Sequence, residues 1–169
     1  MKNSARKLTQ AGVLAALYVV LTYAQNLLLP DSASMAVQFR ISEALCVFAL
    51  FTPSAIWGLG LGCLIFNLSC MGALPLDFFV GTAATLLATL MMYRLRSIRL
   101  WKIPLLSLLM PAVCNGFLVG WELTVYIGNS FWLNAALVAA GEAAVLLTLG
   151  TGLYFLLSRP HIQEILFGR

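Results

Sequence analysis

The chain has 169 residues, of which 62% are hydrophobic and only 9% are charged, and its formal net charge is +4. A soluble domain of this size carries about a quarter charged residues, so the composition excludes a soluble protein and indicates an integral membrane protein. We expect residues 1–169 to form a single transmembrane domain, because this length leaves no room for a second, soluble domain.

Charge-free apolar runs predict the helices in chain order. The first run, Leu8–Leu29, is longer than the core of a signal peptide and predicts a retained span. The second, Ile41–Leu76, contains Thr52-Pro53-Ser54, and the residue before a proline disfavours helix. We therefore expect two short helices here and full spans afterwards. The short helices are placed near Ile41–Phe51 and Ser54–Asn67, and the later spans at Phe78–Tyr93, Ile103–Tyr126 and Phe131–Leu157.

Basic residues predict the orientation of these helices. They cluster in three places, and the positive-inside rule puts all three in the cytoplasm. The clusters are Lys2, Arg6 and Lys7; Arg94, Arg96, Arg99 and Lys102; and Arg159 and Arg169. The chain must cross an even number of times between the first two clusters, so the broken segment Ile41–Leu76 must begin and end outside. We expect an all-α protein of six transmembrane helical segments, with the second and third short and both termini cytoplasmic.

Polar side chains from five helices converge on the outer half of the membrane in this topology. They are Arg40, Glu43, Asn67, Asp77, Asn115, Glu122 and Glu142. Glu122 and Glu142 lie far from helix ends, where a charge in lipid costs at least about 2.5–3.5 kcal/mol. Arg40 is the one basic residue expected on that side. Acids in this situation usually face a cavity or a cationic ligand, so these residues are predicted to border or line a binding site.

Each of these residues also has a purely structural explanation. Arg40 and Glu43 are spaced to pair with each other, Asp77 is placed to cap a helix, and asparagines join helices within membranes. Three aromatic residues beside the acids also have two explanations. They suit an aromatic belt at the membrane interface or a stacking surface for a flat ligand. These are Phe79, Trp121 and Trp132.

The chemistry of the predicted site favours a small planar cation. Carboxylates only accept hydrogen bonds, so they suit an ammonium group or the adjacent N–H donors of a guanine-like edge. No metal ion or cofactor is expected, because the four cysteines lack CxxC spacing and the single histidine, His161, makes a poor metal site in the tail after the last apolar segment. The net charge of +4 does not indicate nucleic-acid binding, because the positive-inside rule explains the excess of basic residues. Ala11 and Ala15 form a small-xxx-small pattern that permits close helix contact, either within the fold or with a partner.

The whole chain resembles QueT, the queuosine-precursor member of the substrate-binding (S) components of energy-coupling factor transporters. VQFRISEAL and NGFLVGWEL are the more specific motifs. Weaker matches are AALYVVLTYA, GLGLGCLIFN, PLDFFVGTAATLLA and FWLNAALVAAGE. The resemblance implies six helices in a bacterial cell membrane, and a substrate site near the outer face for 7-aminomethyl-7-deazaguanine or a relative.

The resemblance also implies partners. S components dock on a transmembrane coupling protein and two ATPase subunits, with Ala11 and Ala15 on the docking face and the loop Pro30–Gln38 closing over the site. The chain has no Walker motif, so it is not expected to be an ATPase or another enzyme. The alternative is a stand-alone secondary transporter in which Glu122 or Glu142 carries a coupling proton. Guanine, queuine and the cyano and aminomethyl precursors all stay open as substrates.

Overall fold

The computed structural model describes residues 2–30, 39–70, 74–100 and 103–168. Within these residues the regular structure is helical, apart from one isolated bridge between Leu100 and Ile103. The all-α prediction is therefore confirmed. Four helical stretches are long and apolar enough to cross a membrane: Ser4–Leu28, Asp77–Leu95, Leu105–Ile127 and Phe131–Leu157.

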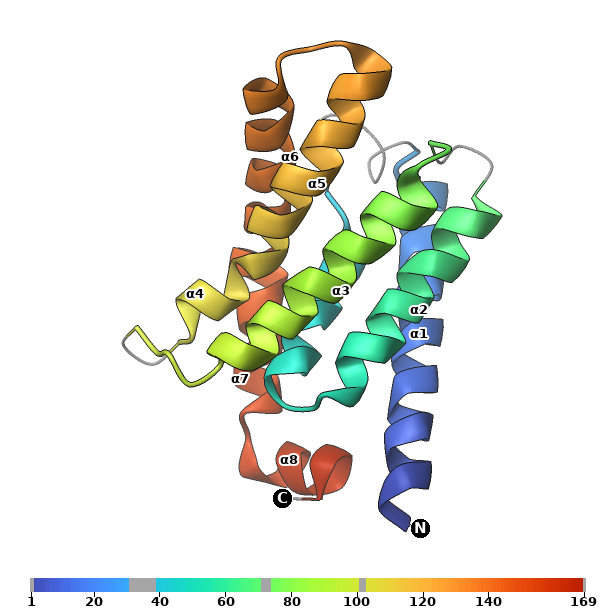
Figure 1. Cartoon of the computed structure of the whole chain (residues 1–169). Helices are drawn as coiled ribbons and strands as arrows, with labels where there is room; N and C mark the ends of the chain where they lie inside the picture. Colours follow the sequence, from blue (N-terminus) through green and yellow to red (C-terminus); the bar gives the residue numbers. More distant parts are fainter. Residues whose placement is uncertain (1, 31–38, 71–73, 101–102, 169) are drawn as a thin grey trace.

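The helices form an elongated bundle (Figure 1). Helix α1 packs against α2, α2 against α3, α3 against α5, and α5 against α6. The elements are α1 (Lys2–Leu28), η1 (Ile41–Leu50), α2 (Ser54–Ser69), α3 (Asp77–Leu95), α4 (Leu105–Leu108), α5 (Met110–Ile127), α6 (Phe131–Val145), η2 (Leu146–Gly150), α7 (Thr151–Leu157) and α8 (Pro160–Phe167). Helices α6 and α7 are joined through the π-helical turn η2 into one apolar stretch.

The predicted break near Pro53 separates η1 from α2, and both helices are shorter than a full span. The sequence did not predict that η1 is a 3₁₀ helix of ten residues. Runs of 3₁₀ helix longer than three or four residues are uncommon, because the hydrogen-bond geometry is poor. Tertiary packing holds η1, since α1, α2, α3, α6, α7 and η2 all contact it. Its residues Cys46, Val47 and Ala49 are completely buried.

Small residues allow α1 and α2 to approach closely. A Cβ added to Gly58 would lie 2.5 Å from the carbonyl oxygen of Ala11, and one added to Gly62 would lie 2.8 Å from that of Ala15. The Ala11–Ala15 pattern therefore packs within the fold. Small residues are common where membrane helices meet. The hydrophobic effect does not drive helices together within lipid, so their association depends on close packing.

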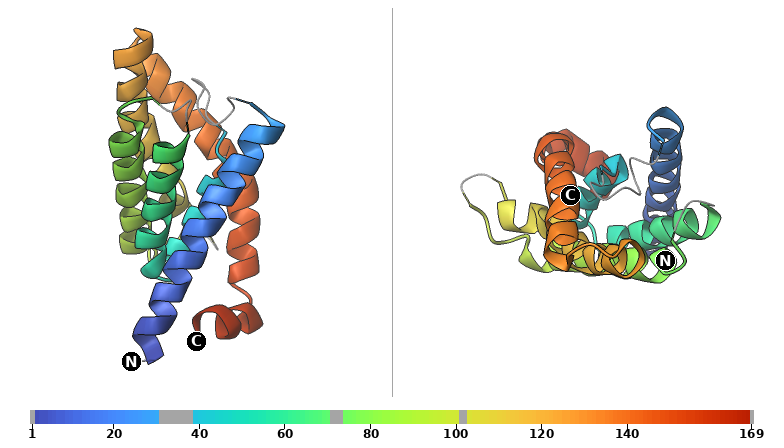
Figure 2. Two further views of the ribbon diagram at one scale, coloured as in Figure 1. Left: turned by 90° about the vertical axis from the view of Figure 1, so that its right-hand side faces the viewer. Right: turned by 90° about the horizontal axis from the view of Figure 1, so that it is seen from above.

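The described members of the basic clusters lie at one end of the bundle (Figure 1). Helix α1 begins and α8 ends at this end (Figure 1). One cavity there is lined by Arg6 and Lys7 of α1 and by Gly168 after α8, and another by Arg96 and Arg99. The sequence did not predict α8, which runs across this end (Figure 2).

Candidate functional site

A layer of buried polar side chains lies among η1, α2, α3, α5 and α6. We call it the polar layer, and it consists of Arg40, Glu43, Asn67, Asp77, Asn115, Glu122 and Glu142. All seven residues were predicted to converge, and all are buried, with Glu43, Glu122 and Glu142 completely inaccessible to solvent. Burial of so many polar groups is costly unless each group finds a partner, so their contacts decide what the layer can bind.

One corner of the polar layer is an ion pair between η1 and α3. Arg40 Nη2 lies 3.9 Å from Asp77 Oδ1. The Asn67 amide donates a 2.8 Å hydrogen bond to the carbonyl oxygen of Asp77. Gly81 makes room for this arrangement, because a Cβ there would lie 2.8 Å from Asn67 Nδ2 and 3.4 Å from Asp77 Oδ1. Among the described residues, Arg40 therefore forms its ion pair with Asp77 of α3 and not with Glu43, which follows Arg40 by three residues.

Glu43 instead accepts a hydrogen bond from a residue of α1. The Tyr18 hydroxyl donates a 2.6 Å hydrogen bond to Glu43 Oε1, and the Cys46 thiol donates one of 3.1 Å to Oε2. Both carboxylate oxygens of Glu43 therefore have partners, and its side chain is fixed before any ligand arrives.

A polar stripe on α1 continues this support. The Thr22 and Ser42 hydroxyls share a 2.8 Å hydrogen bond. The Gln25 amide donates to the carbonyl oxygen of Phe39 and accepts from the amide of Ile41 at 2.7 Å. Sequence reasoning missed these residues. Tyr18, Thr22 and Gln25 follow Ala11 and Ala15 at spacings of three and four, which places all five on one helix face and is the signal that would have found them.

Glu122 and Glu142 differ from Glu43, because none of their carboxylate oxygens has a hydrogen-bond partner among the described residues. Glu122 is within electrostatic range of Asp77, and Glu142 is within electrostatic range of Glu43 and near the amide of Asn115. Arg40 is within electrostatic range of both glutamates. The amide nitrogen of Asn115 also lacks a partner. A buried polar group without a partner costs about 1–3 kcal/mol, and more if it is charged. The carboxyl groups of Glu122 and Glu142 can therefore accept hydrogen bonds from a ligand, and the amide of Asn115 can donate one.

The hairpin of α5 and α6 brings these two glutamates to facing helices. A Cβ on Gly120 would lie 2.7 Å from the Cα of Ala135, so the backbones touch at this point. Asn115 and Glu122 are seven residues apart and share one face of α5. Asn134 on α6, which sequence reasoning also missed, is buried and donates a 3.1 Å hydrogen bond to the Thr124 hydroxyl.

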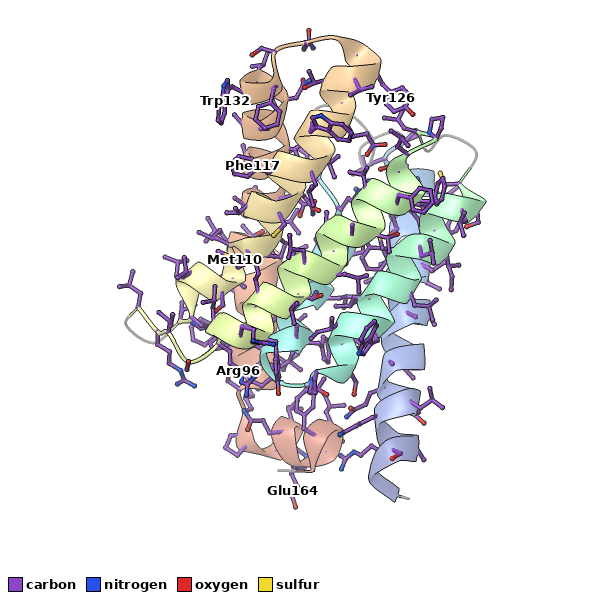
Figure 3. The ribbon with its side chains drawn as sticks, viewed as in Figure 1. Arg96, Met110, Phe117, Tyr126, Trp132 and Glu164 are labelled. Atoms are coloured by element: carbon purple, nitrogen blue, oxygen red, sulfur yellow. The ribbon has the colours of Figure 1, made fainter. Side chains whose placement is uncertain are left out.

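The structure does not bring the three candidate aromatic residues into the polar layer. Phe79, Trp121 and Trp132 are 65%, 50% and 70% exposed. Trp132 points away from the bundle (Figure 3) and contacts the ring of Phe131, with 5.0 Å between ring centroids. This exposure fits the interfacial-belt explanation, in which amphipathic rings lie at headgroup level. Residues 31–38 of the loop expected to close over the site lie outside the described residues.

No group of three or more histidine, cysteine or acidic side chains within the described residues is arranged to hold a metal ion. The polar layer combines unpaired carboxyl groups with one ion pair inside a bundle of apolar helices. A model of the QueT transporter family matches residues 8–159, which span every helix of the polar layer. The chain belongs to the QueT transporter family. This membership makes it a membrane-embedded transporter of a small molecule. No curated protein and no solved structure is significantly similar to it.

Proposed function

We propose that this QueT-family protein is the substrate-binding (S) component of an energy-coupling factor importer in a bacterial cell membrane, and that it binds 7-aminomethyl-7-deazaguanine or a close relative in the polar layer. The observation that carries the proposal is the pair of completely buried glutamates without hydrogen-bond partners, Glu122 and Glu142. An ammonium group and the N–H edge of a deazaguanine supply donors only. They would complete the hydrogen bonds that these carboxylates lack.

The other members of the polar layer have supporting roles in this proposal. Arg40, Glu43, Asn67 and Asp77 border the site and hold one another in place through the contacts described above. Asn115 offers an amide beside Glu142 for the carbonyl group of the purine-like ring. Phe79, Trp121 and Trp132 serve as membrane-interface residues and not as a stacking surface, because each is at least half exposed.

Docking is proposed on the exposed face of α1. The family resemblance implies a small-residue surface on this helix for the transmembrane coupling protein, which works with two ATPase subunits. Ala11 and Ala15 pack against α2, whereas Gly12 has no atom within 4 Å of an added Cβ and Ala16 is exposed. We therefore propose that Gly12 and Ala16 contact the coupling protein. The six-segment topology with cytoplasmic termini belongs to the same proposal, and the position of the described basic residues Arg6, Lys7, Arg96 and Arg99 at one end of the bundle supports it.

Direct binding tests the site. Purified protein is titrated with 7-aminomethyl-7-deazaguanine by calorimetry, together with Glu122→Gln, Glu142→Gln and a matched control, Glu164→Gln. Glu164 is exposed on α8 at the opposite end of the molecule (Figure 3). A hydrogen bond to a charged group contributes about 1.5–3 kcal/mol, so each polar-layer variant should bind about ten- to a hundredfold more weakly. The control should bind like the wild type.

The cyano precursor sharpens the test, because it lacks the ammonium group. If one glutamate pairs with that ammonium, its glutamine variant should lose affinity for the aminomethyl compound and keep its affinity for the cyano compound. Wild-type affinity of both Glu122→Gln and Glu142→Gln for the aminomethyl compound would refute the assignment of the site.

A stand-alone, proton-coupled secondary transporter is the second candidate. The unpaired buried glutamates favour it also, because such acids relay protons in transporters. Proteoliposomes that hold this chain alone, with an imposed pH gradient, distinguish the two functions. Uptake of the deazaguanine without an ATPase module would support the secondary transporter and refute the S-component proposal.

A further inference from the structure

Two cavities meet at the end of the bundle where α1 begins. One has a volume of about 460 Å³ and is lined by Arg6, Lys7 and Tyr93 among others. The second has a volume of about 280 Å³ and is lined mainly by apolar residues of α1, η1 and α8. The cavities share Arg6, Gln10, Thr52 and Phe167, so they open side by side.

Helix α8 forms one wall of the apolar cavity. Its last turn is tied to α1, because Arg6 Nη2 donates to the carbonyl oxygen of Ile165 at 3.1 Å and Gln10 Nε2 donates to that of Leu166 at 2.7 Å. Phe167 stacks on Phe51, the residue that follows η1, with 5.6 Å between ring centroids. No residue of α8 is buried. A short helix that lies across the end of a membrane bundle with exposed apolar side chains suits the bilayer interface (Figure 2).

The apolar cavity is a groove that runs from this end toward the middle of α1. Val13 and Leu17 line it and are 52% and 41% exposed. They follow Arg6 by seven and eleven residues, which is roughly 10 and 16 Å along a helix. The surface is thus basic at the end of the bundle and apolar along the groove, in the order of a phospholipid headgroup and its acyl chain.

We propose that this surface binds one anionic phospholipid, with its phosphate at Lys7 and Arg6 and an acyl chain in the groove. No acidic side chain is among the described residues that line either cavity, and Lys7 forms no ion pair with a described residue. An unopposed basic pair at headgroup level attracts anionic lipid.

Native mass spectrometry of the purified, full-length protein tests the proposal. The protein is incubated with phosphatidylglycerol or with phosphatidylcholine of the same chains, and the bound lipid is counted. Removal of one basic residue near a membrane surface costs about fivefold in affinity. Phosphatidylglycerol should therefore be retained over phosphatidylcholine by at least about fivefold, and Lys7→Gln should abolish most of that preference. Arg159→Gln is the matched control, because Arg159 lines neither cavity.

A second pair of variants tests the groove. Val13→Trp fills it and should reduce lipid retention severalfold, whereas Val125→Trp, at an exposed position on α5 outside the groove, should not. Equal retention of the two lipids by the wild type would overturn the proposal. Equal losses of lipid retention in the Lys7 and Arg159 variants would also overturn it. So would retention of free glycerol phosphate as strong as that of the lipid. If Val13→Trp retains lipid but no longer supports uptake with the coupling subunits, the groove is a protein interface instead.

Discussion

Gly58 is the tightest point of contact between α2 and α1, and its replacement by alanine should destabilise the fold. A Cβ at this position would lie 2.5 Å from the carbonyl oxygen of Ala11, against an ordinary contact of at least 3.4 Å. The two helices must therefore separate by about 0.9 Å locally. Such overpacking costs about 1–3 kcal/mol, and the higher helix propensity of alanine returns at most about 1 kcal/mol. Because the clash is with backbone atoms of Ala11, the cost lies in the upper half of this range, and the net loss is about 1–2 kcal/mol.

Thermal unfolding of the purified protein in one detergent and at one scan rate measures this loss, since membrane-protein melting depends on both. For a chain of this length, the Gly58→Ala melting temperature should fall by about 2–8 °C. Gly12→Ala is the matched control: it is the same substitution on the partner helix, at a position with no atom within 4 Å. It should be neutral or slightly stabilising. Equal melting temperatures for the two variants would refute the close packing of α1 on α2.

Three further predictions concern the polar layer. Gly81→Ala would put a Cβ 2.8 Å from the side-chain amide of the neighbouring asparagine, so calorimetry should show substrate binding weakened about tenfold; unchanged affinity would contradict this. Arg40→Gln leaves Asp77 buried without its ion-pair partner and should lower the unfolding free energy by about 3–5 kcal/mol, with partial recovery on adding Asp77→Asn. Tyr18→Phe removes the hydrogen bond to Glu43 and should cost about 1–3 kcal/mol; a double-mutant cycle with Glu43→Gln that gives additive losses would exclude this coupling.

The position of the helices was predictable because it depends on local properties. Hydropathy is summed over neighbouring residues, so the long apolar runs, and the break before α2, could be read directly from the chain. Pro53 disfavours helix at the residue before it whatever packs around it. The convergence of Glu122 and Glu142 on one layer also followed from the sequence, because helix length and orientation set the depth of each residue.

Partners within the layer were not predictable in the same way. Spacing along the chain predicted an ion pair between Arg40 and Glu43. In the folded protein Arg40 pairs with Asp77 of α3 instead, and Glu43 accepts a hydrogen bond from Tyr18. The exposure of Trp132 likewise depends on how α6 is rotated against α5, and hydropathy does not report rotation.

The sequence by itself determined that this chain is an all-helical membrane protein, where its apolar helical stretches run, and that acids lie within its apolar segments. Only the tertiary structure decided that η1 is a 3₁₀ helix, that Ala11 and Ala15 face α2, and that α8 closes a groove beside α1. The physical reason is the range of the interactions. Transfer from water to lipid is a property of each segment alone, whereas helix rotation, close backbone contact and ion-pair choice depend on which segments meet.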